Sequence, residues 1–244
     1  METYQEFLTR INSFEKQCWS FAPGDFTANL SLTKKVHPDN SFRPFYGDTV
    51  VFDLDDITKE RLLKWLDKLY AEAPECFCER LYADAFHMTL HDLCNSETLE
   101  EVATELFANE QKVREKCTEM TVPASIKMKS KYIFNMVNTS LVLGLYPADE
   151  AEYKKLMELY YMFDDVKRLD YPLTPHITLA YFTVAGFSSE SAKKLEELVC
   201  QLNFAELENE MEIVLEAKDL YYQHFDSMNH YTNVLPIKGE KEQT

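Results

Sequence analysis

Two short stretches of the chain place a histidine and a threonine two positions apart between apolar residues. The first is FHMTLHDL, residues 86–93, which contains His87 and Thr89. The second is PHITLAYF, residues 175–182, which contains His176 and Thr178. Chance gives about 0.4 His-x-Thr matches for this composition, whereas the chain has three. The third, at His230, is followed by Asn233 rather than an apolar residue, and we treat it as a coincidence.

The paired motifs suit acid and base chemistry on a phosphate. Histidine titrates near neutral pH, so one imidazole can take a proton while the other gives one. Two threonine hydroxyls can hold the non-bridging oxygens of a phosphoryl group between them. This chemistry requires neither a metal nor another cofactor. A metal-dependent hydrolase that uses His87, His91, Asp92 and His176 is one alternative, and a non-catalytic phosphate-binding module is another.

The two motifs resemble those of the 2H phosphoesterase superfamily, which includes the bacterial RNA 2′,5′-ligase-like proteins and cyclic nucleotide phosphodiesterases. The resemblance implies a bilobed fold of two pseudo-symmetric antiparallel sheets, each flanked by helices, with a central cleft. It implies that His87 and His176 are the catalytic acid and base, and that Thr89 and Thr178 bind phosphate. The implied substrate is a 2′,3′-cyclic phosphate or a 2′,5′ linkage. Ligase-like relatives often carry a basic residue just after the second motif, where this chain has Tyr181.

Further substrate contacts are predicted near the motifs. Side chains two apart on a strand share a face, so His91 should lie on the face of His87, at the cleft or its edge, with Asp92 on the opposite face. Phe182 should lie on the face of His176. The loop SFRPFYGDT, residues 41–49, offers Arg43 and Tyr46 for pairing and stacking with a nucleotide.

Composition narrows the class of ligand. The formal net charge is −17, and an acidic surface repels a long phosphate backbone. We therefore expect a small phosphorylated ligand, such as a nucleotide, rather than long nucleic acid. The chain lacks a stretch apolar enough to span a bilayer or to act as a secretory signal, and its six cysteines are scattered. These features favour a cytoplasmic protein with reduced thiols.

The elements that must position the motifs alternate along the chain. Periodicity predicts strands over 49–55, 85–93, 126–136, 141–146, 176–184, 211–215, 219–225 and 231–237. It predicts helices over 3–21, 58–73, 96–117, 147–163 and 188–202, with Asp149 and Glu152 arranged as a capping box. The result is an α+β fold that forms a single bilobed domain over residues 1–244. Residues 1–48 could complete a lobe or cover the cleft.

Overall fold

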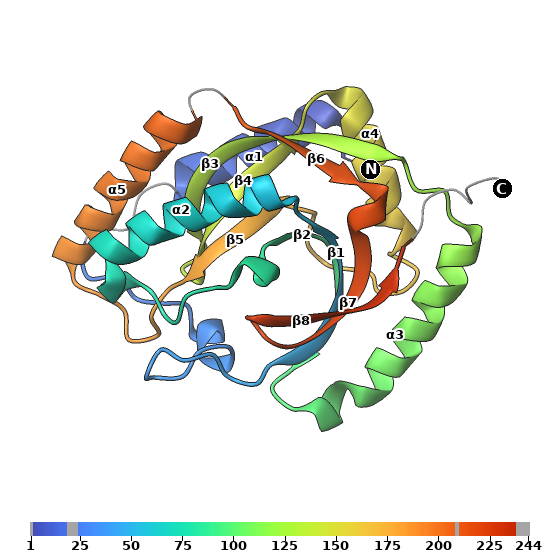
Figure 1. Cartoon of the computed structure of the whole chain (residues 1–244), viewed down its shortest axis with the longest axis horizontal. Helices are drawn as coiled ribbons and strands as arrows, with labels where there is room; N and C mark the ends of the chain where they lie inside the picture. Colours follow the sequence, from blue (N-terminus) through green and yellow to red (C-terminus); the bar gives the residue numbers. More distant parts are fainter. Residues whose placement is uncertain (1, 19–23, 208–209, 238–244) are drawn as a thin grey trace.

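The computed structural model describes residues 2–18, 24–207 and 210–237. Eight strands and five α-helices alternate in these ranges, as the periodicity predicts, with short 3₁₀ helices between them (Figure 1). The elements in chain order are α1 (Tyr4–Cys18), η1 (Leu30–Lys34), β1 (Tyr46–Asp53), α2 (Asp56–Glu72), η2 (Pro74–Cys76), η3 (Ala83–Ala85), β2 (His87–Ser96), α3 (Leu99–Glu119), β3 (Ser125–Met136), β4 (Ser140–Pro147), α4 (Glu150–Met162), β5 (His176–Tyr181), α5 (Ser189–Leu207), β6 (Glu212–Glu216), η4 (Ala217–Asp219), β7 (Leu220–Ser227) and β8 (His230–Pro236).

The strands form one curled antiparallel sheet in the order β6-β3-β4-β5-β2-β1-β7-β8. The prediction of two separate sheets is not met, because β2 and β5 are hydrogen-bonded neighbours at the centre. They pair through a single register position, Met88 with Ile177. On either side of this position lie four strands, β6-β3-β4-β5 and β2-β1-β7-β8, which we call the two halves of the sheet. Each half therefore contributes one motif strand to the junction between β2 and β5, which we call the seam.

The helices begin where the sequence supplies side-chain caps. Asp55 caps α2 by accepting a hydrogen bond from the Thr58 backbone N–H at 2.9 Å. Asp149 caps α4 and accepts from the N–H groups of Ala151 and Glu152. The predicted capping box is only half formed, because the Glu152 carboxylate accepts instead from the Lys127 N–H of β3. That bond ties the start of α4 to the sheet.

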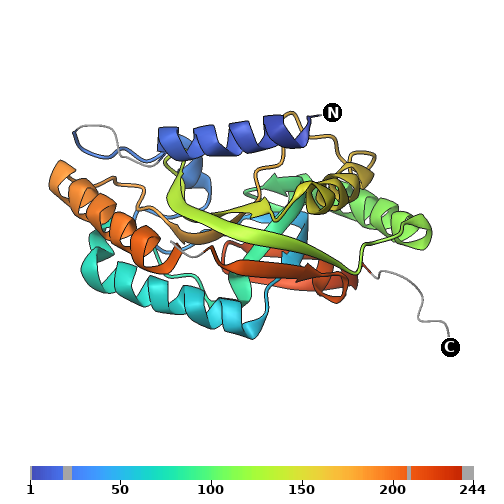
Figure 2. The ribbon, with the colours of Figure 1, turned by 90° about the horizontal axis from the view of Figure 1, so that it is seen from above.

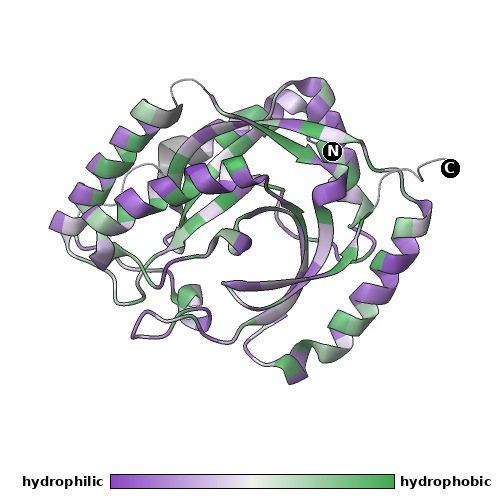
Figure 3. Ribbon diagram, in the orientation of Figure 1, coloured by the Kyte–Doolittle hydropathy of each residue, from purple (hydrophilic) through white to green (hydrophobic). Residues whose placement is uncertain are grey.

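The helices cover the sheet from opposite sides. Figure 2 shows α1 on one side, with α2 and α5 side by side on the other. Hydrophobic and hydrophilic residues alternate along these helices in Figure 3, as expected for helices with one buried face. Buried side chains from both halves and from α1, α2 and α5 join one main cluster that includes Phe7, Leu66, Met88, Ile177 and Leu195. The core is therefore continuous across the seam.

The N-terminal segment contacts the rest of the fold at two places. Phe7 of α1 is fully buried, and its ring packs against Tyr153 of α4 with centroids 5.1 Å apart. Farther along, Asn29 donates from its backbone N–H and its side chain to the turn between β3 and β4. This contact places η1 and Lys35 beside the central strands. The helix predicted over 3–21 is described from Tyr4 to Cys18, and residues 19–21 lie outside the described ranges.

Candidate active site

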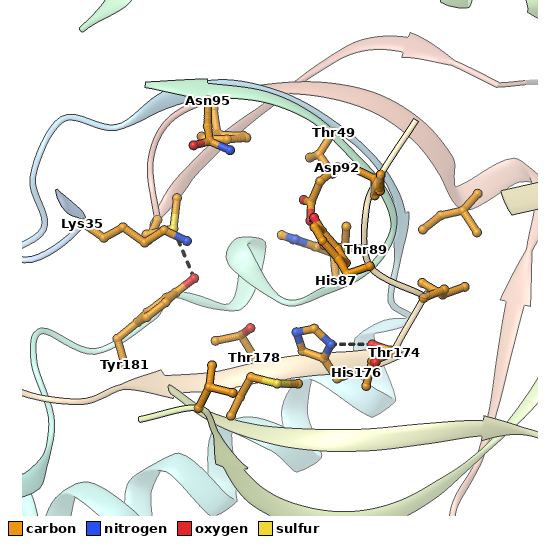
Figure 4. A pocket seen from close by; sticks show the side chains of 18 of the residues that line it. Lys35, Thr49, His87, Thr89, Asp92, Asn95, Thr174, His176, Thr178 and Tyr181 are labelled. Carbon is orange, nitrogen blue, oxygen red and sulfur yellow. Dashed lines mark hydrogen bonds between the residues drawn. The ribbon is translucent and has the colours of Figure 1, made fainter. Parts of the chain in front are cut away.

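The two motifs face one cavity of about 800 Å³ at the seam of the sheet. His87 and Thr89 enter it from β2, and His176 and Thr178 enter it from β5 (Figure 4). All four side chains are partly exposed, while Met88 and Ile177 between them are fully buried. The motif strands also contribute Asp92, Asn95 and Tyr181 to the walls. The remaining polar or charged lining residues come from other parts of the chain: Arg10, Ser31, Lys35, Thr49, Tyr160, Tyr171, Thr174 and Tyr231.

A β-bulge follows the threonine in each motif strand. Val51 of β1 pairs with Thr89, but Val50 pairs with His91, so Leu90 is an extra residue. Val142 of β4 likewise pairs with Thr178 while Leu141 pairs with Ala180, which leaves Leu179 extra. An extra residue reverses the alternation of faces along the rest of a strand. The third residue after each threonine therefore faces the cavity, and these residues are Asp92 and Tyr181.

The bulge overturns the prediction for His91. Its side chain is 1% exposed and stacks on Tyr160 of α4, with ring centroids 4.9 Å apart. The Nδ1 atom lies 2.8 Å from the Asp92 carbonyl oxygen, and Nε2 lies 3.4 Å from the Asp164 carboxylate. His91 thus packs on the face of β2 that points away from the cavity. Asp92 lines the cavity in the position that was predicted for His91. The proposed metal set of His87, His91, Asp92 and His176 is not assembled.

Each catalytic candidate is anchored through the backbone two residues before it. His176 Nδ1 lies 2.7 Å from the carbonyl oxygen of Thr174, and a carbonyl can only accept, so Nδ1 carries the hydrogen. His87 makes the corresponding hydrogen bond to the backbone of Ala85. For His176 this fixes the tautomer that leaves Nε2 available to a ligand.

Burial keeps both imidazoles neutral at pH 7. Burial lowers the pKa of His87 to about 4, although the carboxylates of Asp53 and Asp92 act in the opposite direction. Burial also lowers the pKa of His176, against the hydrogen bond to Thr174 and the charge of Asp92. Both rings are therefore poised as proton acceptors before a ligand binds.

Lys35 supplies a cation that sequence reasoning missed. Its Nζ lies 5.7 Å from the centroid of the Tyr181 ring and 5.2 Å from that of Phe45. Burial lowers its pKa, while Asp92 raises it. Within the described ranges no carboxylate is close enough to pair with it. Tyr181 thus stands where a basic residue could follow the second motif, and the side chain of Lys35, the residue just after η1, reaches the Tyr181 ring instead (Figure 4).

Tyr181 and Arg10 make hydrogen bonds at opposite ends of the second motif. The Tyr181 hydroxyl donates to Met228 Sδ at 3.1 Å and hydrogen-bonds the side chain of Thr178. Arg10 of α1 donates to the Leu173 carbonyl at 2.9 Å and to the Thr174 hydroxyl at 3.2 Å. Arg10 therefore holds the residue whose carbonyl orients His176.

Three other predicted substrate contacts lie outside the cavity. Arg43 donates to the Thr33 carbonyl, and Tyr46 belongs to β1, where it packs against the small cluster of Cys94, Val102 and Leu106. Phe182 is fully buried, and its ring lies near that of Phe77. Phe182 follows the bulge in β5, which turned Tyr181 toward the cavity in its place.

The third His-x-Thr match is separate from the site, as expected. His230 is exposed and pairs with Asp226 at 2.7 Å. Its neighbour Tyr231 does reach the cavity, where its ring lies 4.6 Å from that of His87. No sequence signal distinguished Tyr231, Lys35 or Arg10, because each reaches the site through a long-range contact.

The part of the chain that the structure describes contains no group of three or more side chains placed to hold a metal ion. Nor does any helix within those ranges have the length and apolar character to cross a membrane.

Comparison with solved structures relates the fold to known proteins. The structure of a conserved protein of unknown function from Agrobacterium tumefaciens C58 is similar to this chain with a TM-score of 0.65 and 18% identity, over 87% of this chain and 94% of that one. The two proteins therefore share a fold. No family model and no curated protein sequence matches the chain.

Two further matches are more distant. Escherichia coli LigT, solved with 3′-AMP, has a TM-score of 0.46 and 16% identity over 78% of this chain and 96% of that one. A structure described as a phosphoesterase has a TM-score of 0.47 and 14% identity over 77% and 95%.

Proposed function

We propose that this protein is a metal-independent phosphodiesterase of the 2H type. The observation that carries the proposal is the placement of both His-x-Thr pairs on neighbouring strands of one cavity. In this proposal the protein is a single bilobed domain, and the lobes are the two halves of the sheet. Its substrate is a small cyclic phosphate or nucleotide of the 2′,3′-cyclic type, for which 800 Å³ is ample room.

The two histidines divide the proton transfers. One neutral imidazole takes a proton from water at Nε2 while the water oxygen attacks phosphorus. The bond from phosphorus to the leaving alkoxide breaks, and the other histidine, in its protonated form, gives that oxygen a proton. Thr89, Thr178 and Lys35 hold the non-bridging oxygens, where charge gathers in the transition state.

The low pKa values of the free protein fit this division. A bound phosphate brings a negative charge next to both rings, and a nearby negative charge raises the pKa of an imidazole. Substrate binding therefore favours protonation of one histidine and leaves the other as the base. The acid therefore forms when the substrate binds, and neither histidine has to be protonated before that.

The test is turnover of 2′,3′-cyclic nucleotides in the presence of EDTA. The variants are His87→Gln and His176→Gln, with His230→Gln as the matched control because it belongs to the third His-x-Thr match outside the cavity. We expect each motif variant to lose about 100-fold or more in kcat, the scale of a general acid or base, and the control to equal the wild type.

Two results would count against the proposal. Loss of turnover in EDTA, restored by a divalent ion, would indicate a metal-dependent hydrolase. Binding of cyclic nucleotides without turnover in a broad panel would indicate a phosphate-binding module.

A further inference from the structure

The carboxylate of Asp92 is an unexpected group in a cavity that is proposed to bind phosphate. Its side chain is exposed to the cavity beside His87 and Thr89, with Lys35 on the other side of the space (Figure 4). It raises the pKa of both motif histidines and of Lys35, so its charge reaches the whole site. A carboxylate so placed repels a phosphate ester. A binding site for phosphate alone would function better without it.

The position of Asp92 is fixed by the strand rather than by a mobile loop. The bulge at Leu90 turns it inward, and the corresponding bulge in β5 turns Tyr181 inward. The extended motif is thus His-x-Thr-x-x-Z, in which the last residue is acidic in one copy and aromatic in the other. The two copies differ in chemistry at this one place facing the cavity.

The hydrogen bonds of Asp92 are incomplete. Its Oδ2 accepts from the Tyr171 hydroxyl at 2.9 Å. Burial raises the pKa of Tyr171, so the phenol stays protonated and keeps donating. Within the described ranges no cation pairs with Asp92, and its Oδ1 makes no hydrogen bond. A carboxylate can accept about four hydrogen bonds, so most of its capacity faces the ligand space.

We propose that Asp92 and Tyr171 form a subsite for a hydrogen-bond donor on the alcohol portion of the substrate. The donor is a hydroxyl or an ammonium group, while an arm that carries a second phosphate or a carboxylate is rejected by charge. This inference rests on the proposed function and narrows it. The substrate class is a phosphate ester with a single anionic group and a donor-bearing arm.

The test uses alkyl phosphates that differ only at the end of the arm. With arms of two, three or four carbons, the end group is methyl, hydroxyl, amino or carboxylate, and dissociation constants are measured by calorimetry. We expect the wild type to bind the best hydroxyl or amino ligand about 10-fold more tightly than the methyl ligand of the same length, the scale of a hydrogen bond to a charged group. The carboxylate ligands should bind most weakly. The hydroxyl and amino arms distinguish a polyol from an amine as the natural donor.

The variants are Asp92→Asn and Asp92→Ala, with Asp56→Asn as the control because Asp56 is exposed in the first turn of α2, outside the cavity. Asp92→Asn should abolish the preference for amino over methyl arms and the discrimination against carboxylate, and Asp92→Ala should abolish the hydroxyl preference as well. Asp56→Asn should match the wild type.

Two results would overturn the inference in different ways. If all ligands bind but their ranking is the same in Asp92→Ala as in the wild type, the subsite is wrong and the proposed function stands. If the wild type binds none of these esters and no inorganic phosphate, the phosphate site itself is wrong, and both proposals fall. Melting temperatures of the variants, measured alongside, show that each has folded.

Discussion

At the scale of single residues, the site depends on how its imidazoles are held. Each motif histidine bonds the backbone two positions before it, so the strand itself orients the ring. The residues that orient each ring therefore lie within the motif strand or directly before it. The residues that sequence reasoning identified, His87, Thr89, His176 and Thr178, are those whose geometry follows from the strand alone. Lys35, Arg10 and Tyr231 lie far from the motifs in the sequence and approach them only in the folded protein. A local sequence pattern cannot predict such contacts.

The low pKa of His87 predicts that acid destabilises the protein. Burial lowers this pKa to about 4 from the ordinary value of 6.5. Between these values the unfolded chain binds a proton that the folded protein excludes, so the free energy of unfolding falls as pH falls through that window. The contribution of His87 is on the order of 2–3 kcal/mol, complete above pH 6.5 and lost by about pH 4.

Urea denaturation at pH 7, 5.5 and 4.5 measures this effect. His87→Gln cannot titrate and should lose less stability over the window than the wild type, whereas His230→Gln should lose as much. Equal losses in the wild type and His87→Gln would show that His87 is not the group responsible.

At the scale of elements, helix α1 reaches the candidate site through the side chain of Arg10. Arg10 bonds Leu173 and Thr174, and Thr174 in turn orients His176. A side chain of the N-terminal helix thus holds the residue whose carbonyl orients the His176 ring. Arg10 is a positioning residue, since it acts on the reaction through Thr174.

Replacement of this residue should separate positioning from binding. In Arg10→Met we expect kcat to fall about 10-fold, equivalent to about 1.4 kcal/mol, while the affinity for inorganic phosphate changes less than about threefold. Arg114→Met, on the exposed side of α3, is the control, because that arginine pairs with Glu110 of its own helix and does not line the cavity. An unchanged kcat in Arg10→Met would remove the role assigned to α1.

The elements also show where prediction from sequence stops. All eight strands and the five α-helices follow from the spacing of apolar residues, because that spacing reflects which face is buried. The bulges do not, because Leu90 and Leu179 are ordinary apolar residues whose extra place appears only against the partner strand. One inserted residue in each strand was enough to exchange the positions of His91 and Asp92 in β2 and those of Phe182 and Tyr181 at the end of β5.

At the scale of the whole molecule, the cavity lies across the seam between two halves of one sheet. Thr89 belongs to one half and Thr178 to the other, so a phosphate bound in the way that we propose would contact both. The ligand thereby adds a bridge at the place where the backbone provides only one register position.

Inorganic phosphate should therefore stabilise the protein against heat. At a concentration of about 100 times the dissociation constant, binding contributes about 2.7 kcal/mol. For a chain of this size that corresponds to a rise in Tm of roughly 5–10 °C. Thr89→Val and Thr178→Val should each reduce the rise at the same phosphate concentration, as followed by scanning calorimetry. A rise that only one of the two variants reduces would place the phosphate in one half.

The single pairing at the seam also bears on how the chain is made. Met88 and Ile177 lie 89 positions apart, whereas β3–β4 and β7–β8 are joined by short turns. The entropy of closing a loop increases with its length, so hairpins form before distant strands meet. During synthesis β2 leaves the ribosome well before β5. During that interval the edge of β2 that pairs with β5 has no partner strand. The two motif strands therefore meet late in folding, and until then the edge of β2 that faces β5 is unpaired, which is the kind of exposed strand edge that favours aggregation.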